Sequence, residues 1–199
     1  MNSTVKIKSI FASRWIWVAT FVAAVLIGFC ASYAWASIVC TGGVCNGTNG
    51  PDTMIGSSGP DTISGLDGND EVYGNDGNDI VRGNGGADPW VGGNDDVDDV
   101  YGGPGNDPEV HGGPGDDREL LNRGVYGGSG NDFVYGDGGY DTLTGDEGKD
   151  NLDGGAENNG LHADDGEQDW LYGGAGTNNY CWYDSALDYR LRCDVNFPS

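Results

Sequence analysis

The stretch "GLDGNDEVYGNDGNDIVRG", residues 65–83, repeats itself every nine residues. Each nine-residue unit, here called a word, begins with the pattern G-x-x-G-x-D and ends with three residues of which the middle one is apolar. Glycine at the first and fourth places permits the positive φ and close backbone approach of a tight turn. The closing residues, such as Glu71, Val72 and Tyr73, favour a very short strand. The stretch therefore predicts an alternation of turns and short strands.

The same words continue through most of the chain. Ten words keep the full pattern, whereas the word at Gly92 has Val97 in its sixth place, and the words at Gly154 and Gly173 have Asn159 and Asn178 there. Repetition over this length indicates a stacked repeat architecture. The fourteen words begin at Gly47, Gly56, Gly65, Gly74, Gly83, Gly92, Gly102, Gly112, Gly127, Gly136, Gly145, Gly154, Ala163 and Gly173.

Strand alternation points only the eighth residue of each word inward. One apolar residue per word cannot form a core, so the words must stack as a solenoid with two words per coil, each word lying on the one eighteen residues away. A sandwich of hairpins is the alternative, but strands of three residues are short for it. The expected inward residues are Met54, Ile63, Val72, Val81, Trp90, Val134, Leu143 and Leu152.

Stacking also places the sixth-place aspartates in columns, about 5 Å apart. At that distance two carboxylates repel by about 3 kcal/mol at an effective dielectric near 20. Several such pairs would cancel the ~5 to 15 kcal/mol stability of a domain unless a cation lies between the turns. Oxygen ligands alone favour calcium over magnesium. The alternative is that each aspartate only caps its own turn.

The words resemble the G-G-x-G-x-D-x-U-x nonapeptide of the RTX, or haemolysin-type, calcium-binding repeats. This resemblance implies an all-β, right-handed parallel β-roll of about fourteen words, with several Ca²⁺ ions between successive turns. In that family the sixth-place aspartate supplies the side-chain ligand and turn carbonyls supply most of the rest. The implied ligands are Asp52, Asp61, Asp70, Asp79, Asp88, Asp107, Asp117, Asp132, Asp141 and Asp150.

The first 36 residues have a different composition. Basic residues near the start are followed by the charge-free run from Trp15 to Ala36, which predicts a hydrophobic helix, and "Ala34-Trp35-Ala36" is typical of a signal-peptidase site. An uncleaved membrane anchor facing outside is the alternative. We therefore expect a signal peptide at 1–36, an N-terminal cap at 37–46, the β-roll at 47–181, a C-terminal cap at 182–199, and a secreted protein.

The charge of the chain points to cations as partners. It has 32 acidic and 9 basic side chains, a net charge of −23, which becomes −26 once the leader with its three basic residues is removed. Nucleic acid is not an expected partner, because phosphate contacts need clustered Lys and Arg.

Four cysteines flank the repeats, and export would oxidise them. Fourteen words at two per coil give about seven layers, or roughly 30 Å between the ends. A disulfide needs Cα atoms within about 7 Å, so the ends cannot be joined. The predicted bonds are Cys40–Cys45 and Cys181–Cys193, one in each cap.

Catalysis is not expected. His111 and His162 fall on strand ends as exposed strand residues, and the chain lacks a G-x-S-x-G nucleophile elbow. The alternative function is a cell-surface adhesion or ligand-binding solenoid, for glycans or ice, in which calcium is purely structural. A flat array of threonines or aromatic residues on one face would favour this alternative. No uniform array of this kind is present at the ninth place of the words, which is Tyr73, Tyr101, Tyr135 and Tyr172 but also Ser64, Arg82, Thr144 and Asp153.

Overall fold

The computed structural model describes residues 36–117 and 124–198. By its internal contacts the chain divides into two units, Met1–Ala34 and Trp35–Ser199, and the described residues belong to the second. Except for Ala36, the predicted leader helix and its cleavage site lie outside the described residues. Within the described ranges, no helix has the length and apolar character needed to cross a membrane.

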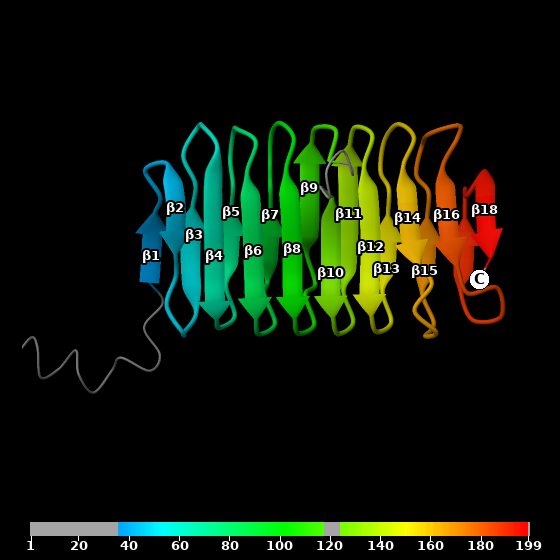
Figure 1. The fold of residues 1–199 in the computed structure, drawn as a ribbon, viewed down its shortest axis with the longest axis horizontal. Coiled ribbons are helices and arrows are strands. Elements are labelled where there is room, and N and C mark those ends of the chain that lie inside the picture. The colour runs from blue at the N-terminus through cyan, green and yellow to red at the C-terminus, as the bar shows by residue number, and fades with distance from the viewer. Residues whose placement is uncertain (1–35, 118–123, 199) are drawn as a thin grey trace, which may run out of the picture. The chain divides into compact units, whose positions relative to one another are not determined.

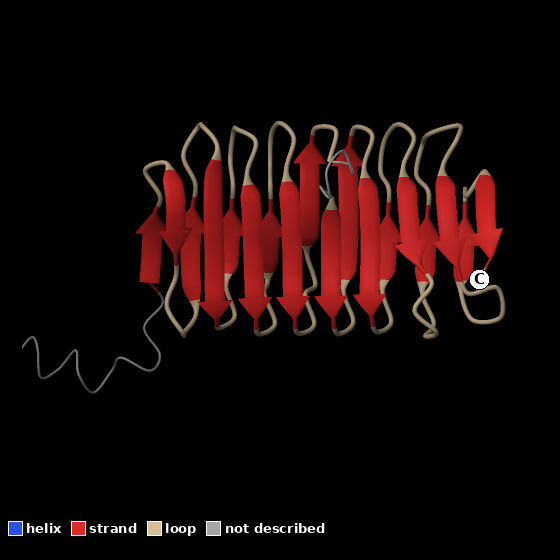
Figure 2. Cartoon of the chain, viewed as in Figure 1, coloured by secondary structure: helices blue, strands red, loops and turns tan. Residues whose placement is uncertain are grey.

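The described residues form a parallel β-solenoid made of two nine-stranded sheets, joined at both edges by turns (Figures 1 and 2). The odd sheet consists of β1 (Ala36–Val39), β3 (Asp52–Ile55), β5 (Glu71–Tyr73), β7 (Trp90–Gly92), β9 (Val110–Pro114), β11 (Phe133–Gly138), β13 (Asn151–Asp153), β15 (Trp170–Tyr172) and β17 (Tyr189–Leu191). The even sheet consists of β2 (Gly43–Asn46), β4 (Asp61–Asp67), β6 (Ile80–Gly85), β8 (Asp99–Pro104), β10 (Val125–Ser129), β12 (Thr142–Glu147), β14 (Gly160–Ala163), β16 (Tyr180–Tyr183) and β18 (Val195–Pro198).

Each interior strand pairs in parallel with the strands two before and two after it in the chain, and the terminal strands β1, β2, β17 and β18 pair on one side. Thr53 aligns with Glu71 and Ile63 with Val81, in each case eighteen residues away. The predicted arrangement of two words per coil is therefore confirmed. The described solenoid has about nine coils rather than seven, because β1 and β2 add a coil at one end and β17 and β18 add one at the other.

A single file of apolar side chains from each sheet fills the core. Each inward residue is almost completely buried, which stabilises the fold by about 1.5 to 3 kcal/mol for a Val or Leu side chain. These residues are Met54, Ile63, Val72, Val81, Val91, Val100, Val110, Val125, Val134, Leu143, Leu152, Leu161 and Leu171.

The prediction that Trp90 points inward was wrong. Val91 is fully buried in its place, and Trp90 is half-buried on the outer face of the odd sheet. The cause is the sequence Asp88-Pro89-Trp90, because proline has no N–H to begin the sheet ladder and the strand starts one residue later.

The fourth-place glycines allow successive turns to touch. Gly148 has a φ of 135°, a region that side chains rarely adopt, and a Cβ atom there would collide with the carbonyl oxygen of Gly130 in the preceding coil. Because that neighbour is backbone, it cannot move aside. The glycine spacing in the sequence thus sets the spacing of the coils.

Candidate metal sites

Two columns of polar side chains follow the two edges of the solenoid. Most column residues lie at the start of a strand or one or two residues before it, and Asp107 and Asp117 lie further ahead of β9 and β10. The lower column in Figure 1 leads into the odd sheet and the upper column into the even sheet. The lower column consists of Asp52, Asp70, Asp88, Asp107, Asp132, Asp150, Asp169 and Asp188. The upper column consists of Asp61, Asp79, Asp98, Asp117, Asp141, Asn159, Asn179 and Asp194.

One oxygen of each interior aspartate is fixed by the neighbouring coil. The backbone N–H of Asp52 donates to Asp70 Oδ1 at 2.9 Å, and the N–H of Asp88 donates to Asp107 Oδ1 at 2.8 Å. The same bond repeats along both columns. The carboxylates therefore cannot rotate out to solvent without breaking a buried hydrogen bond in the next coil.

The second oxygen of each interior aspartate is buried without a hydrogen-bond partner in the described structure. This holds for Oδ2 of Asp70, Asp79, Asp88, Asp98, Asp107, Asp117, Asp132, Asp141, Asp150 and Asp169. An unpaired buried acceptor costs about 1 to 3 kcal/mol, and more when it is charged. Ten such atoms in one fold indicate a missing electropositive partner.

These free oxygens point toward other oxygens. A Cβ atom placed on Gly127 would lie 2.8 Å from Asp132 Oδ2 and 2.8 Å from the carbonyl oxygen of Gly145 in the next coil. At Gly136 the corresponding distances are 2.6 Å to Asp141 Oδ2 and 2.7 Å to the carbonyl oxygen of Gly154. The first-place glycine thus leaves open a space bounded by a carboxylate and a carbonyl, two acceptors that a cation can bring together.

Burial makes these carboxyl groups unusually weak acids. It raises the pKa of Asp88 to about 7 and that of Asp98 to about 8, although the backbone hydrogen bond from the neighbouring coil opposes the rise. Burial likewise raises the pKa of Asp141 and of Asp150 to about 8. In each case the charges of neighbouring aspartates raise the pKa further. The charged columns are therefore unfavourable without a counter-charge.

Two asparagines show how a turn closes without a cation. Asn159 Nδ2 donates to the carbonyl oxygens of Gly154 at 2.6 Å and Ala156 at 2.8 Å. Asn179 Nδ2 donates to the carbonyl oxygen of Arg192 at 3.2 Å. The amide group thus occupies the place of the free Oδ2 and satisfies carbonyls of the kind that face Oδ2 in the aspartate turns. These two turns need no ion.

The donor set fits calcium. Each space is bounded by a carboxylate oxygen and a backbone carbonyl oxygen, and within the described residues no group of three or more His, Cys, Asp or Glu side chains is placed to hold a metal ion by side chains alone. Oxygen-only, flexible coordination suits Ca²⁺, whereas zinc and copper favour nitrogen or sulfur ligands.

The ten aspartates predicted from the sequence all lie in the columns and are all buried. Two more with a free Oδ2 were missed, Asp98 and Asp169. At Gly92 the word starts one residue later, so Asp98 rather than Val97 is the column residue. In the words at Ala163 and Gly173 the turn is one residue longer, so Asp169 and Asn179 are the column residues, and the sixth place assigned to Asn178 was wrong.

The last residues of each word identify both missed aspartates. In "Asp98-Asp99-Val100-Tyr101" and "Asp169-Trp170-Leu171-Tyr172" an aspartate precedes a buried apolar residue by two places, as in regular words. The glycine pattern alone gave the wrong start for these words, because doublets such as Gly92–Gly93 leave the first residue of the word ambiguous.

The described residues contain two disulfides, Cys40–Cys45 and Cys181–Cys193, with Cα atoms 5.8 and 5.7 Å apart. This is the pairing predicted from the sequence. Each bond ties one terminal segment to the solenoid, and each contributes a sulfur atom to the core at Cys40 or Cys181. The end coils, whose strand edges have no further partner in the described solenoid, are thereby fastened.

Comparison with known families agrees with this geometry. Residues 46–81, 55–88 and 126–161 match the RTX calcium-binding nonapeptide repeat (four copies). These segments are RTX repeats, as the sequence predicts, and they form the most regular parts of the solenoid. Comparisons with curated proteins and with solved structures gave no match. Between the matched segments Asp98, Asp107 and Asp117 continue the columns through words of irregular length.

Proposed function

We propose that this chain is an exported calcium-binding protein whose right-handed β-roll folds around several Ca²⁺ ions held between stacked turns. The observation that carries the proposal is the row of buried aspartates whose Oδ2 atoms face backbone carbonyls with no donor between them. A bound calcium ion would supply the positive charge that these oxygens lack.

The chain's own groups would prepare each site before an ion arrives. The hydrogen bond to Oδ1 holds the carboxylate in one orientation, and the first-place glycine keeps open the space in front of Oδ2. Ligands that are oriented in advance lose less entropy on binding. The fold and the sites would still be interdependent, because a turn contributes to a site only when it is stacked on its neighbour.

If folding depends on calcium, export would determine where the chain folds. Extracellular calcium modules bind at roughly 10⁻⁴ to 10⁻³ M, so the chain would stay unfolded in a low-calcium cytoplasm and fold outside. The two disulfides support an extracellular location, since such bonds persist in oxidising compartments. We further propose the domain limits expected above and a non-catalytic role, because RTX repeats are typically structural calcium-binding elements.

A pair of variants in one turn tests the proposal. Asp79 is buried in the upper column with a free Oδ2, and Asp76 is exposed in the same turn. Asp79→Asn and Asp76→Asn change the charge equally, but only Asp79→Asn should lower the number of calcium ions bound in isothermal titration calorimetry. Far-ultraviolet circular dichroism of the unmodified chain should show strand signal in millimolar calcium and lose it in chelator. A fully ordered β-spectrum in excess chelator at pH 8 contradicts the proposal.

A second candidate function, glycan binding with structural calcium, is favoured by one feature of the outer surface of the odd sheet, which is considered next.

A further inference from the structure

Aromatic side chains form a ladder on the outer face of the odd sheet. The rings of Tyr73, Trp90, His111 and Tyr135 are stacked in sequence, with centroids 5.8, 4.4 and 4.5 Å apart. Trp90, the eighth residue of its word, pairs with the seventh-place residue Glu71 and reaches this row by leaning over Gly92, where a Cβ atom would lie 2.7 Å from Trp90 Nε1. The prediction of an exposed His111 was therefore wrong, since its side chain is only 15% exposed between two rings.

The ladder is interrupted at β13 and then resumes. Next to Tyr135 and Phe133 on β11, strand β13 presents the short polar side chains of Asp153 and Asn151. On the far side, β15 presents Tyr172 and Trp170, and the Trp170 ring is stacked on that of Tyr189 at 5.9 Å. One rung of the ladder is thus absent between two pairs of aromatic walls.

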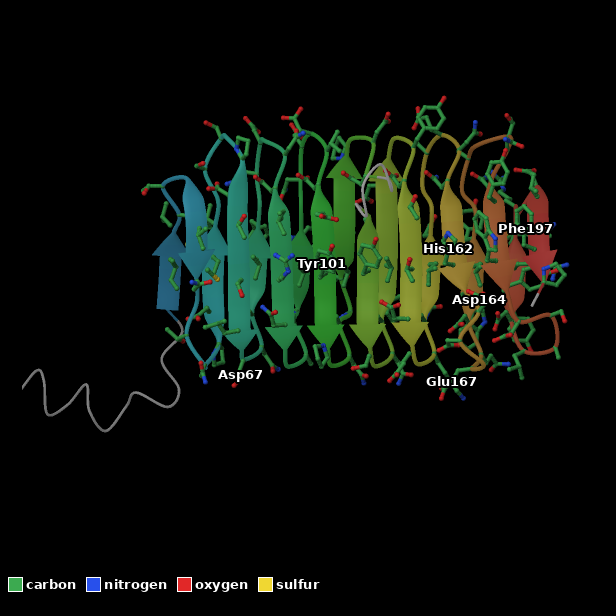
Figure 3. The ribbon with its side chains drawn as sticks, viewed as in Figure 1. Asp67, Tyr101, His162, Asp164, Glu167 and Phe197 are labelled. Atoms are coloured by element: carbon green, nitrogen blue, oxygen red, sulfur yellow. A yellow bond between two sulfur atoms is a disulfide. The ribbon has the colours of Figure 1, made fainter. Side chains whose placement is uncertain are left out.

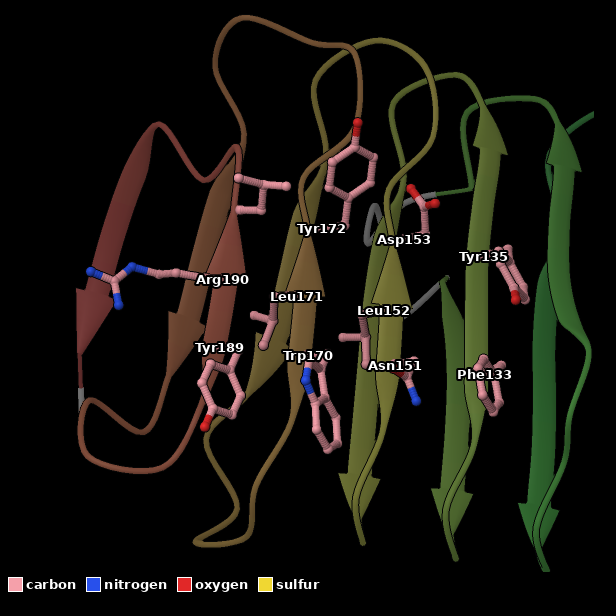
Figure 4. A pocket seen from close by; sticks show the side chains of 11 residues that line it. Phe133, Tyr135, Asn151, Leu152, Asp153, Trp170, Leu171, Tyr172, Tyr189 and Arg190 are labelled. Atoms are coloured by element: carbon pink, nitrogen blue, oxygen red, sulfur yellow. The ribbon is translucent and has the colours of Figure 1, made fainter.

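The absent rung leaves a slot, which we define by its walls, Phe133, Tyr135, Trp170 and Tyr172, and its floor, Asn151 and Asp153 (Figure 4). The pocket that includes this slot, and that continues past Trp170 to Tyr189 and Leu191 on β17, has a volume of about 380 Å³. Two strand spacings separate the walls, or about 10 Å. That width admits one flat ring stacked on both walls at the 4.4 to 5.9 Å spacing of the ladder itself.

The floor can both donate and accept hydrogen bonds. The Asn151 amide carries both kinds of group. Asp153 is held in place by the N–H of Gly155, which donates to its Oδ1 at 3.0 Å. Among the lining residues Asp153 and Arg190 are the two that carry charge, of opposite sign. The Arg190 guanidinium lies over the Tyr183 ring at 4.1 Å and is not part of the walls or floor, so Asp153 is the one charged residue of the slot as defined. Its carboxylate can accept hydrogen bonds from ligand hydroxyl groups.

We propose that the slot binds a neutral pyranose ring of an oligosaccharide whose ring substituents are all equatorial, as in glucose or N-acetylglucosamine. Such a ring presents axial C–H groups on both faces, which stack on aromatic walls, and hydroxyl groups at its edge, which pair with Asn151 and Asp153. An axial hydroxyl would instead press a polar group against one wall. A quaternary ammonium ion would stack as well, but it would leave the hydrogen-bonding groups of Asn151 unused.

This inference goes beyond calcium binding, on which it depends only through the fold. The other sheet supplies a matched control, because His162, Trp182 and Phe197 form an uninterrupted stack there with centroids 4.1 and 4.8 Å apart. Tyr101, His162 and Phe197 are seen on that face in Figure 3. Truncating Trp182 removes a half-buried, stacked indole ring from the other sheet without touching the slot.

The test is isothermal titration calorimetry of the full chain in millimolar calcium with cellohexaose and chitohexaose. We expect at least one to bind, and Trp170→Ala to weaken its binding by at least about tenfold, a typical loss for a stacked aromatic contact. Asp153→Tyr, which fills the absent rung, should abolish binding without removing any wall. Trp182→Ala should leave the affinity within about twofold of the original.

Circular dichroism of each variant in calcium, measured in parallel, separates loss of the slot from loss of the fold. The proposal is overturned if neither oligosaccharide binds, or if a β-1,4-linked galactohexaose, with its axial C4 oxygen, binds as tightly. It is also overturned if choline chloride binds at the slot in place of the sugars, or if Trp182→Ala weakens sugar binding as much as Trp170→Ala does.

Discussion

Replacing Asn159 by aspartate should add a calcium site to the upper column. In the present chain Asn159 Nδ2 donates to the carbonyl oxygens of Gly154 and Ala156 at 2.6 and 2.8 Å. An aspartate would turn this donor into an acceptor among carbonyl oxygens, as at Gly136, where a Cβ atom would lie 2.6 Å from Asp141 Oδ2 and 2.7 Å from the carbonyl oxygen of Gly154. Oδ1 would still accept the N–H of Asp141, so the backbone need not change.

The expected magnitudes have opposite signs at low and high calcium. Without calcium, Asn159→Asp loses two hydrogen bonds of about 1 kcal/mol each and buries an unpaired charge, for a total loss of about 3 to 5 kcal/mol. Each additional ion bound only by the folded state makes the free energy of unfolding rise by a further 1.4 kcal/mol or so per tenfold increase in free calcium. The variant should therefore be less stable at low calcium and recover as calcium increases.

The assay is urea unfolding of the full chain, followed by circular dichroism at several free calcium concentrations above about 1 mM, the upper end of the affinity range of extracellular modules. The control is Asn158→Asp, which makes the same charge change at the adjacent residue. Asn158 Oδ1 accepts two backbone N–H groups, and an aspartate at this position can accept both as well. Equal calcium dependence in Asn159→Asp and the original chain would refute the reasoning, as would an equal increase in Asn158→Asp.

Three further predictions concern pH and the covalent links. In a strong chelator the strand signal in circular dichroism should be strongest near pH 5.5 and be lost as pH rises to about 8.5, because column aspartates with folded pKa values raised to about 6 to 8 keep their protons longer than the unfolded chain does. A strand signal in chelator that does not depend on pH would contradict this, and added calcium should restore the signal at high pH. Burial alone would lower the pKa of His111, but hydrogen bonds from its ring to Asp137 and Glu109 raise it overall. His111→Gln in saturating calcium should therefore cost up to about 1 kcal/mol more near pH 6 than near pH 9, where the imidazole is neutral and the loss of the stacked ring remains; an unchanged cost across this range would mean that the charge is irrelevant. Removing the Cys181–Cys193 bond by a double serine substitution should lower the free energy of unfolding by about 3 kcal/mol, and removing Cys40–Cys45 by about 2, because the bonds close loops of 12 and 5 residues; equal urea midpoints with and without the bonds would show that the terminal coils do not unfold with the rest.

Most of the fold could be predicted because the nine-residue period carries turn, strand and core position together. The register at Gly92 and the direction of Trp90 could not, since both depend on where proline and a glycine doublet shift the start of a strand. The pairing of Val91 with Val72 and Val110 in the neighbouring coils settles which residue faces the core. The identity of a repeat is thus local in the sequence, whereas its phase is decided by the neighbouring coil.

The slot on the odd sheet was also beyond the sequence pattern. The ninth residues of the words are of several types, and the ninth-place row that includes Tyr73 and Tyr135 has Gly92, which carries no ring, between them. The ladder becomes continuous only because the Trp90 side chain covers Gly92 and stacks on His111 at 4.4 Å. Contact between side chains from different places in their words cannot be inferred from periodicity.

The second place of each word sets how its aspartate is used. In the first two words, Thr48 and Ser57 donate both their N–H and their hydroxyl to Oδ2 of Asp52 and Asp61. Many later words have Asn, Asp or Gly at this place with positive φ, which β-branched threonine disfavours, and there Oδ2 has no partner. Toward the other end of the upper column, the amides of Asn159 and Asn179 provide donors again. Side-chain donors thus satisfy one oxygen of Asp52 and Asp61 in the first turns and replace the free oxygen at Asn159 and Asn179 in the upper column, whereas Oδ1 of Asp52 and Asp61 and Oδ2 of Asp169 stay buried without a partner.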